Sequence, residues 1–164
     1  MTMAELNGLD RVGFVDAVGW IFEHSPWVAE RAFDARPFAS MDALHAAMTE
    51  QVERGTFAER LALLKAHPDL GARARLSTAS AQEQAGAGLD SLTPGEFEQL
   101  QRLNAAYRSR FGFPFLLAVK GSTKHDVLRA LQARMEASPE DEFREALRQV
   151  YRIARFRMEG LITS

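Results

Sequence analysis

Residues 93–112 read TPGEFEQLQRLNAAYRSRFG, and this stretch has the pattern of one long amphipathic helix. Thr93 precedes Pro94 and stands three residues before Glu96, an arrangement typical of a helix N-terminus. Apolar and amide side chains then recur at spacings of three and four residues as far as Gly112. The stripe consists of Phe97, Leu100, Asn104, Tyr107 and Phe111.

Helical periodicity also dominates the rest of the chain. Ser80 stands three residues before Glu83, which predicts a capping box that opens a short helix. Ser40 and Ser122 are further predicted helix starts, and a last helix follows Ser138-Pro139. The helices that follow Ser40, Ser122 and Ser138-Pro139 have their apolar residues at 41–52, 127–135 and 143–158. Further helical segments are predicted at 14–22, 27–34 and 57–64.

Residues 113–119 (FPFLLAV) are the one stretch that reads as extended. A lone apolar strand has no partner in a sheet, so we interpret it as a buried link between helices. Its backbone amides and carbonyls must then find other partners, and a ligand is one candidate. The sequence therefore predicts an all-α, single-domain bundle over residues 1–164, with about seven to nine helices and this link at 113–119.

Composition excludes several classes of protein. The 164 residues include no cysteine, which removes disulfide frameworks and thiolate chemistry, and a net charge of −2 offers no basic face for nucleic acid. No run approaches the roughly 20 apolar residues of a membrane span, and no signal peptide is recognisable, so we expect a cytoplasmic protein. No metal site is expected either, because the histidines form no close pair. They are His24, His45, His67 and His125.

His67 is the first candidate for chemistry, in the stretch His67-Pro68-Asp69-Leu70-Gly71. The following proline restricts its backbone, and an imidazole titrates near neutral pH, which suits proton transfer. The alternative is a histidine that only interacts with the dipole at a helix C-terminus. Spacing alone leaves both interpretations open.

The second candidate is the run Ser80-Ala81-Gln82-Glu83-Gln84. It places a hydroxyl, a carboxylate and an amide within one turn at a predicted helix N-terminus, which favours anions. The alternative is that Glu83 serves only as the acid of the capping box. The nearby glycines follow no strand, so a nucleotide-binding loop is not expected.

The third candidate is a group of arginines near the end of the chain. Arg148, Arg152 and Arg155 share one helical face, as in a solvated stripe, whereas Arg157 is rotated toward the apolar side. A partly buried guanidinium needs an anion. That anion is either a carboxylate of the protein or one of a ligand, and the sequence leaves both open.

Taken together and in order, these stretches resemble the decarboxylases of 2-oxo-4-hydroxy-4-carboxy-5-ureidoimidazoline (OHCU), the last enzymes on the route from urate to (S)-allantoin. The likeness covers nearly the whole chain. Its matching stretches are EHSPWV (23–28), HPDLG (67–71), EQAGAGL (83–89), LNAAY (103–107), RFGFPF (110–115), AVKG (118–121) and IARFR (153–157).

This resemblance implies a fold, a chemistry and a site. The family is all-helical, uses no metal or organic cofactor and is commonly dimeric, so it implies a homodimer with a small-molecule substrate. Its catalytic histidine and glutamate correspond to His67 and Glu83. The implied substrate contacts are the Pro68 carbonyl, Ser80, Gln84, the backbone of Phe115, Leu116, Leu117, Ala118 and Val119, and Arg157 in preference to Arg155.

The resemblance thus implies a carboxy-lyase. A catalytically inactive, all-α module that binds a small molecule is the alternative, and a helical scaffold without a ligand is a further one. Retention of both His67 and Glu83 favours the enzyme. An assay of turnover separates the three.

Overall fold

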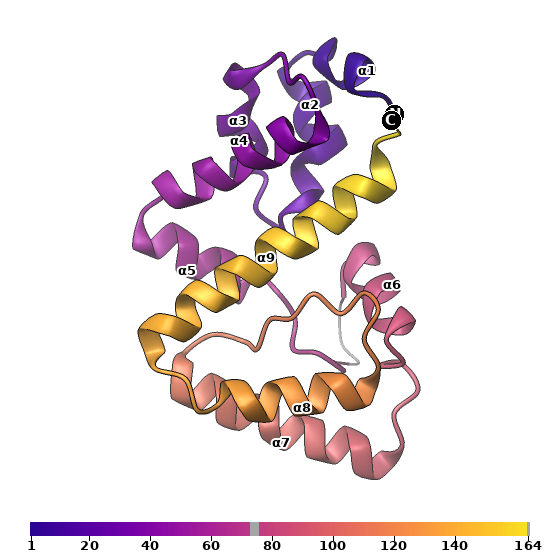
Figure 1. The fold of residues 1–164 in the computed structure, drawn as a ribbon, viewed down its shortest axis with the longest axis vertical. Helices are drawn as coiled ribbons and strands as arrows, with labels where there is room; N and C mark the ends of the chain where they lie inside the picture. Colours follow the sequence, from indigo (N-terminus) through magenta and orange to yellow (C-terminus); the bar gives the residue numbers. More distant parts are fainter. Residues whose placement is uncertain (73–75, 164) are drawn as a thin grey trace. The chain divides into compact units, whose positions relative to one another are not determined.

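The computed structural model describes residues 1–72 and 76–163, which contain nine α-helices, two short 3-10 helices and no strand (Figure 1). This confirms the predicted all-α class and the number of helices. In chain order the elements are α1 (Met3–Asn7), α2 (Arg11–Val18), η1 (Gly19–Ile21), α3 (Trp27–Ala32), η2 (Phe33–Ala35), α4 (Met41–Arg54), α5 (Phe57–Lys65), α6 (Thr78–Gly86), α7 (Pro94–Phe111), α8 (Lys124–Arg134) and α9 (Pro139–Leu161).

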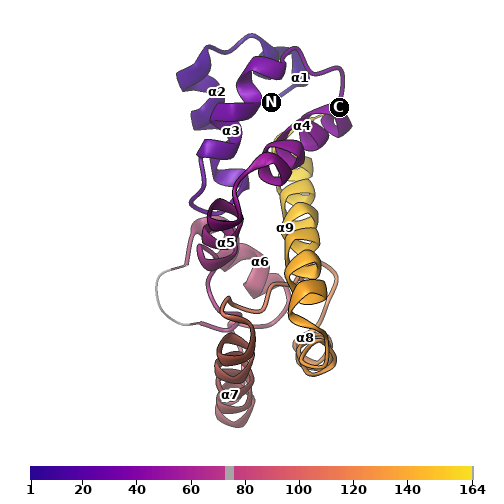
Figure 2. The same ribbon diagram turned by 90° about the vertical axis from the view of Figure 1, so that its left-hand side faces the viewer.

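These elements fall into two compact units. The first comprises Met1–Ala66 and Tyr151–Ser164, and the second comprises His67–Val150. In the first unit α3 packs against α2 and α4, and the chain ends meet where the Thr163 amide donates to the Met1 carbonyl at 2.8 Å. In the second unit α7 packs against α8 (Figure 2). That the whole chain forms a single domain stays a prediction.

The start of α7 shows why the sequence signals for this helix were sufficient. The Thr93 hydroxyl accepts from the Glu96 amide at 3.2 Å, and the Glu96 carboxylate accepts from the Thr93 amide at 2.9 Å. Lys124 donates to the same carboxylate at 2.7 Å. This hydrogen bond, with that from the Thr93 backbone, lowers the pKa of Glu96 to about 2. The predicted cap of α4 at Ser40 is likewise confirmed.

Two predicted helix starts are wrong. Helix α6 is capped by Ser77, whose hydroxyl accepts from the Ser80 amide at 3.1 Å, so Ser80 lies inside the first turn. Helix α8 is capped by Thr123 in place of Ser122, because Thr123 forms a reciprocal capping box with Asp126. The first correction matters for function, since Glu83 is not the acid of a capping box.

The link at 113–119 is confirmed as a segment without helix or strand. All of its residues are buried except Leu117, which is half-buried. Its phenylalanines pack on Tyr107, with a ring-centroid distance of 5.4 Å for Phe115. The aromatic cluster Tyr107, Phe111, Phe113 and Phe115 is therefore the part of the second unit's core that holds the link.

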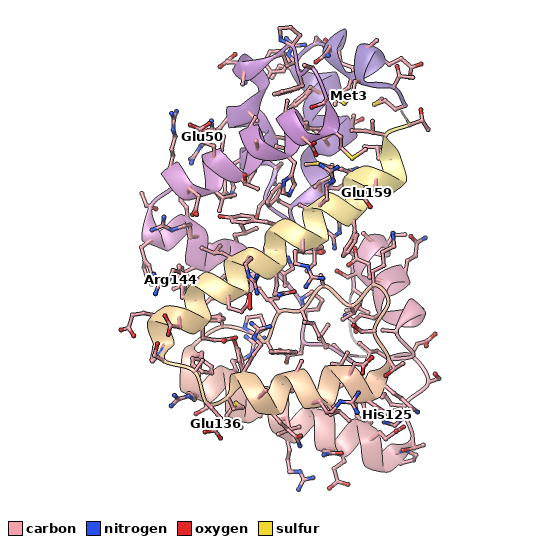
Figure 3. The ribbon with its side chains drawn as sticks, in the orientation of Figure 1. Met3, Glu50, His125, Glu136, Arg144 and Glu159 are labelled. Atoms are coloured by element: carbon pink, nitrogen blue, oxygen red, sulfur yellow. The ribbon has the colours of Figure 1, made fainter. Side chains whose placement is uncertain are left out.

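Charged residues occupy the outer faces of the helices. His125 on α8 and Arg144 on α9 are both exposed (Figure 3). Across the described parts of the chain, no helix is long and apolar enough to cross a membrane.

Candidate active site

His67 is the first residue of the second unit and directly follows the end of α5, which is capped at Ala66. Only 6% of its surface is exposed. The next residue, Pro68, is half-buried, and its carbonyl accepts no hydrogen bond from residues 1–72 or 76–163. Such a carbonyl is available to a ligand.

The segment after His67 is held from two sides. The Asn104 side-chain amide, on α7, donates to the Leu70 carbonyl at 2.9 Å. The Gln84 side-chain oxygen, on α6, accepts from the Gly71 amide at 2.8 Å. Asn104 and Gln84 are both more than nine-tenths buried, so these bonds are shielded from water. The structure therefore brings the His67 segment and α6 together.

Gly71 is required at this point for two reasons. Its φ of +78° lies in the left-handed region, which only glycine adopts without strain. A Cβ here would stand 2.5 Å from a methyl group of Leu100 and 3.3 Å from one of Leu92. The turn therefore depends on the missing side chain.

Ser80, Glu83 and Gln84 lie on one face of α6, at spacings of three and four residues. Ser80 and Gln84 are buried, and Glu83 is half-buried. Gln84 uses its oxygen for Gly71, while its Nε2 makes no hydrogen bond to the residues that the structure describes. The Gln84 Nε2 group thus remains as a donor for a ligand.

The link at 113–119 is held by side chains from α8 and α9. Arg134 donates through Nη1 to the Leu116 carbonyl. The Gln149 side-chain oxygen accepts from the Ala118 amide at 3.0 Å. Between them, the N–H and C=O of Leu117 make no hydrogen bond within the described chain. This is the residue of the link with the most exposed surface.

Arg157 belongs to the first unit and is buried there, as its position on the apolar side of the helix predicted. Its Nη2 lies 2.8 Å from the Glu23 carboxylate, and the exposed fractions of the two side chains are 4% and 1%. Nη1 donates to the carbonyls of Trp20 and Ile21 at 3.3 and 3.2 Å. The anion that the sequence left open is thus, at least in part, Glu23.

The other arginines of this group behave as a solvated stripe. Arg148 is exposed and pairs with Glu145 one turn earlier on α9. Arg152 is exposed. Arg155 pairs with Asp42 and with Glu159, the latter at 3.2 Å, and about a third of its side chain is exposed.

A sequence model described as OHCU decarboxylase matches residues 7–159. The chain belongs to this family. A protein of Haloferax volcanii named 2-oxo-4-hydroxy-4-carboxy-5-ureidoimidazoline decarboxylase is 49% identical over 164 residues, which cover 100% of this chain and 98% of that protein. A protein of the same name from Mus musculus is 37% identical over 166 residues, which cover 99% of this chain and 93% of that protein. Among solved structures, that of (S)-allantoin synthase aligns with a TM-score of 0.81 at 36% identity, over 100% of this chain and 54% of that one.

Four residues that were not predicted as site residues hold the predicted ones in place. Asn104 lies in the matching stretch LNAAY (103–107) and is also an amide in an otherwise apolar stripe. Arg134 and Gln149 carried none, because their partners are backbone groups 18 and 31 residues away. Glu23 stands in one of the matching stretches, but its role as the partner of Arg157 emerges only from the fold.

The second unit also contains a cavity of about 510 Å³ between α7 and residues 69–72. It is lined by Leu70, Leu100, Asn104 and Arg108 among others. None of the site residues predicted for this chain lines it. In the described ranges, no cluster of three or more histidine, aspartate and glutamate side chains is placed to hold a metal ion.

Proposed function

We propose that this chain catalyses the decarboxylation of OHCU to (S)-allantoin and CO2 in the degradation of urate. The observation that carries the proposal is the match over the full length to the decarboxylase of Haloferax volcanii, at 49% identity. The likeness in fold to (S)-allantoin synthase supports the same activity. The protein is accordingly a carboxy-lyase.

The substrate supplies its own electron sink. One ring carbon carries the carboxylate and a hydroxyl, and its neighbour is a C=N carbon that bears the ureido group. When the bond to CO2 breaks, its electron pair forms a C=C bond, and the C=N pair moves to the nitrogen, which takes a proton. The resulting enol then loses its hydroxyl proton and gains one on the ureido carbon. The protein must position the carboxylate and choose the face of protonation.

We assign the proton transfers to His67. A buried imidazole can take the proton of the hydroxyl or return one to carbon near neutral pH. Glu83, on the exposed side of the α6 face, would orient this imidazole or bind the ureido nitrogens. General acid–base catalysis of this kind contributes about 10²–10⁴-fold.

Substrate contacts are proposed for the groups that the resemblance implies. Three of them offer polar atoms to a ligand: the Pro68 carbonyl, the Gln84 Nε2 group and the backbone of Leu117. Ser80, the remainder of residues 115–119 and Arg157 complete the proposed set. A homodimer, a cytoplasmic location and independence from any cofactor are proposed on the same basis.

The test is a coupled reaction followed by circular dichroism. Urate oxidase and 5-hydroxyisourate hydrolase generate the substrate, which decays slowly to racemic allantoin without help. Addition of the protein should accelerate allantoin formation and give a dichroic signal of the S enantiomer. Allantoin formed at the buffer rate without optical activity contradicts the proposal. Binding of allantoin without turnover would instead identify an inactive binding module.

His67→Asn tests the catalytic assignment. We expect the variant to lose about 10²–10⁴-fold in rate, together with the chirality of the product, and to retain the far-UV spectrum. His125→Asn is the matched control, because His125 is exposed on α8 and outside the proposed site. Equal losses in the two variants would remove His67 from the mechanism.

A further inference from the structure

The link at 113–119 is held along one edge by two side chains, the buried Gln149 and the half-buried Arg134. The bonds to the Leu116 carbonyl and the Ala118 amide lie two residues apart, which places them on the same edge of an extended backbone. The N–H and C=O of Leu117 then point to the opposite edge. They form a donor and an acceptor side by side.

The two anchors also change the chemistry of these free groups. A peptide unit is one resonance system, so a donor on its oxygen makes its N–H a stronger donor. Arg134 is charged and binds the oxygen of the unit whose N–H belongs to Leu117. Gln149 accepts from the unit whose C=O belongs to Leu117 and makes that oxygen a stronger acceptor. The hydrogen bonds from Arg134 and to Gln149 thus polarise the N–H and the C=O of Leu117 through the two peptide units that contain them.

Arg134 is held rigidly in this task. Its Nε donates to Glu142 at 2.8 Å, and the Tyr107 hydroxyl donates to the same carboxylate oxygen. The guanidinium lies 4.5 Å from the centre of the Phe115 ring. The exposed fractions of the Arg134 and Glu142 side chains are 14% and 1%, so the pair is largely shielded from water. Burial, together with the hydrogen bond to Glu142, raises the pKa of Tyr107. The ion pair with Glu142 therefore fixes the guanidinium that faces the Leu116 carbonyl.

We propose that Arg134 and Gln149 are positioning residues for the decarboxylation. They fix and polarise the link so that Leu117 offers its N–H and C=O as a paired donor and acceptor to an N–H–C=O unit of the substrate, of the kind found in a ureide or a cyclic amide. Glu142 and Tyr107 hold Arg134 in place. This inference rests on the proposed function for its substrate.

Two variants remove the anchors separately. Gln149→Leu removes the acceptor of the Ala118 amide. Arg134→Met combined with Glu142→Gln removes the donor to Leu116 and leaves no unpaired buried carboxylate, while the new amide still accepts from Tyr107. Arg110→Met is the matched control, because Arg110 also donates to a backbone carbonyl, that of Ala137 at 2.8 Å, and lies outside the link.

The first measurement is steady-state kinetics with OHCU. Each anchor variant should raise KM by about 5- to 10-fold and change kcat by less than about threefold, with the pH profile of the wild type. The control should keep the wild-type KM. A wild-type KM in both folded anchor variants, or an equal rise in the control, overturns the inference.

The second measurement needs no turnover. In ¹⁵N-labelled wild-type protein, the Leu117 amide should shift on addition of (S)-allantoin, and in the Arg134→Met/Glu142→Gln variant its proton should move upfield before any ligand is added. An unmoved Leu117 resonance in that variant refutes polarisation, even where the wild-type protein turns over. Failure of the wild-type protein to decarboxylate OHCU refutes the proposed function instead, so the two failures are distinct.

Discussion

Replacement of Arg157 by methionine should destabilise the protein more than any other arginine substitution in α9. The change leaves the Glu23 carboxylate, 1% exposed, without its cation 2.8 Å away. It also removes the donor to the carbonyls of Trp20 and Ile21. Breaking a buried ion pair on one side costs about 3–5 kcal/mol, and we expect a loss of that size in the free energy of unfolding.

The control is two positions away on the same helix. Arg155→Met breaks ion pairs with Asp42 and Glu159, but its side chain is about one-third exposed and its partners are more so. Exposed pairs contribute about 0–1 kcal/mol. Urea denaturation followed by far-UV circular dichroism should therefore show a large loss in the free energy of unfolding for Arg157→Met and a small one for Arg155→Met.

A second substitution separates a lost charge from lost packing. Arg157→Met combined with Glu23→Leu removes both charges, and the pair should recover at least about 1 kcal/mol relative to Arg157→Met alone. The loss in the single variant should also shrink as the pH falls from about 7 to about 5, because a buried carboxylate that has lost its guanidinium takes up a proton more readily. Equal losses at Arg155 and Arg157, or a double variant less stable than the single one, would refute this reasoning.

Three other outcomes test the second unit. Gly71→Ala should cost about 2–3 kcal/mol against about 1–2 kcal/mol for Gly112→Ala in urea titrations, because both glycines have positive φ but only the first methyl group meets a side chain. Asn104→Leu should lower kcat roughly tenfold at an unchanged far-UV spectrum, since the segment after His67, the proposed catalytic histidine, loses an anchor. Glu96→Gln should lose stability near neutral pH and much less at about pH 2, where Glu96 is about half protonated in the folded state. The hydrogen bond from Lys124 lowers the pKa of Glu96 from 4.5 to about 2, so its contribution is complete above 4.5 and decreases as the pH falls through that range in denaturation curves.

Helix ends were predictable where a local pattern had no competitor. Thr93, Pro94 and Glu96 identify the start of α7 from sequence, and the structure has the same capping box. Ser80 and Glu83 match the same pattern, yet Ser77 is the cap. Ser80 is buried inside the first turn, and a pattern of four residues does not contain that information.

In the candidate site, too, some features could be predicted from the sequence and others are determined only by the fold. The sequence indicates that Arg157 needs an anion, but Glu23 lies 134 residues away and only the fold selects it. The roles of His67 and Glu83 come from the family resemblance, since each had an ordinary structural alternative. The structure removes one of these alternatives, because Glu83 does not cap its helix.

Two of the segments proposed to carry the chemistry have no regular secondary structure. Residues 67–71 and 113–119 have backbone groups that must find partners outside regular structure. In both segments amide or guanidinium side chains from helices bind some of these groups, through Asn104 and Gln84 in one and through Arg134 and Gln149 in the other. The groups without a hydrogen bond in residues 1–72 and 76–163 include the Pro68 carbonyl and both polar groups of Leu117, the half-buried residue of the link. A reaction whose substrate is its own electron sink asks mainly for accurate positioning, and rigid segments with a few free polar groups are suited to provide it.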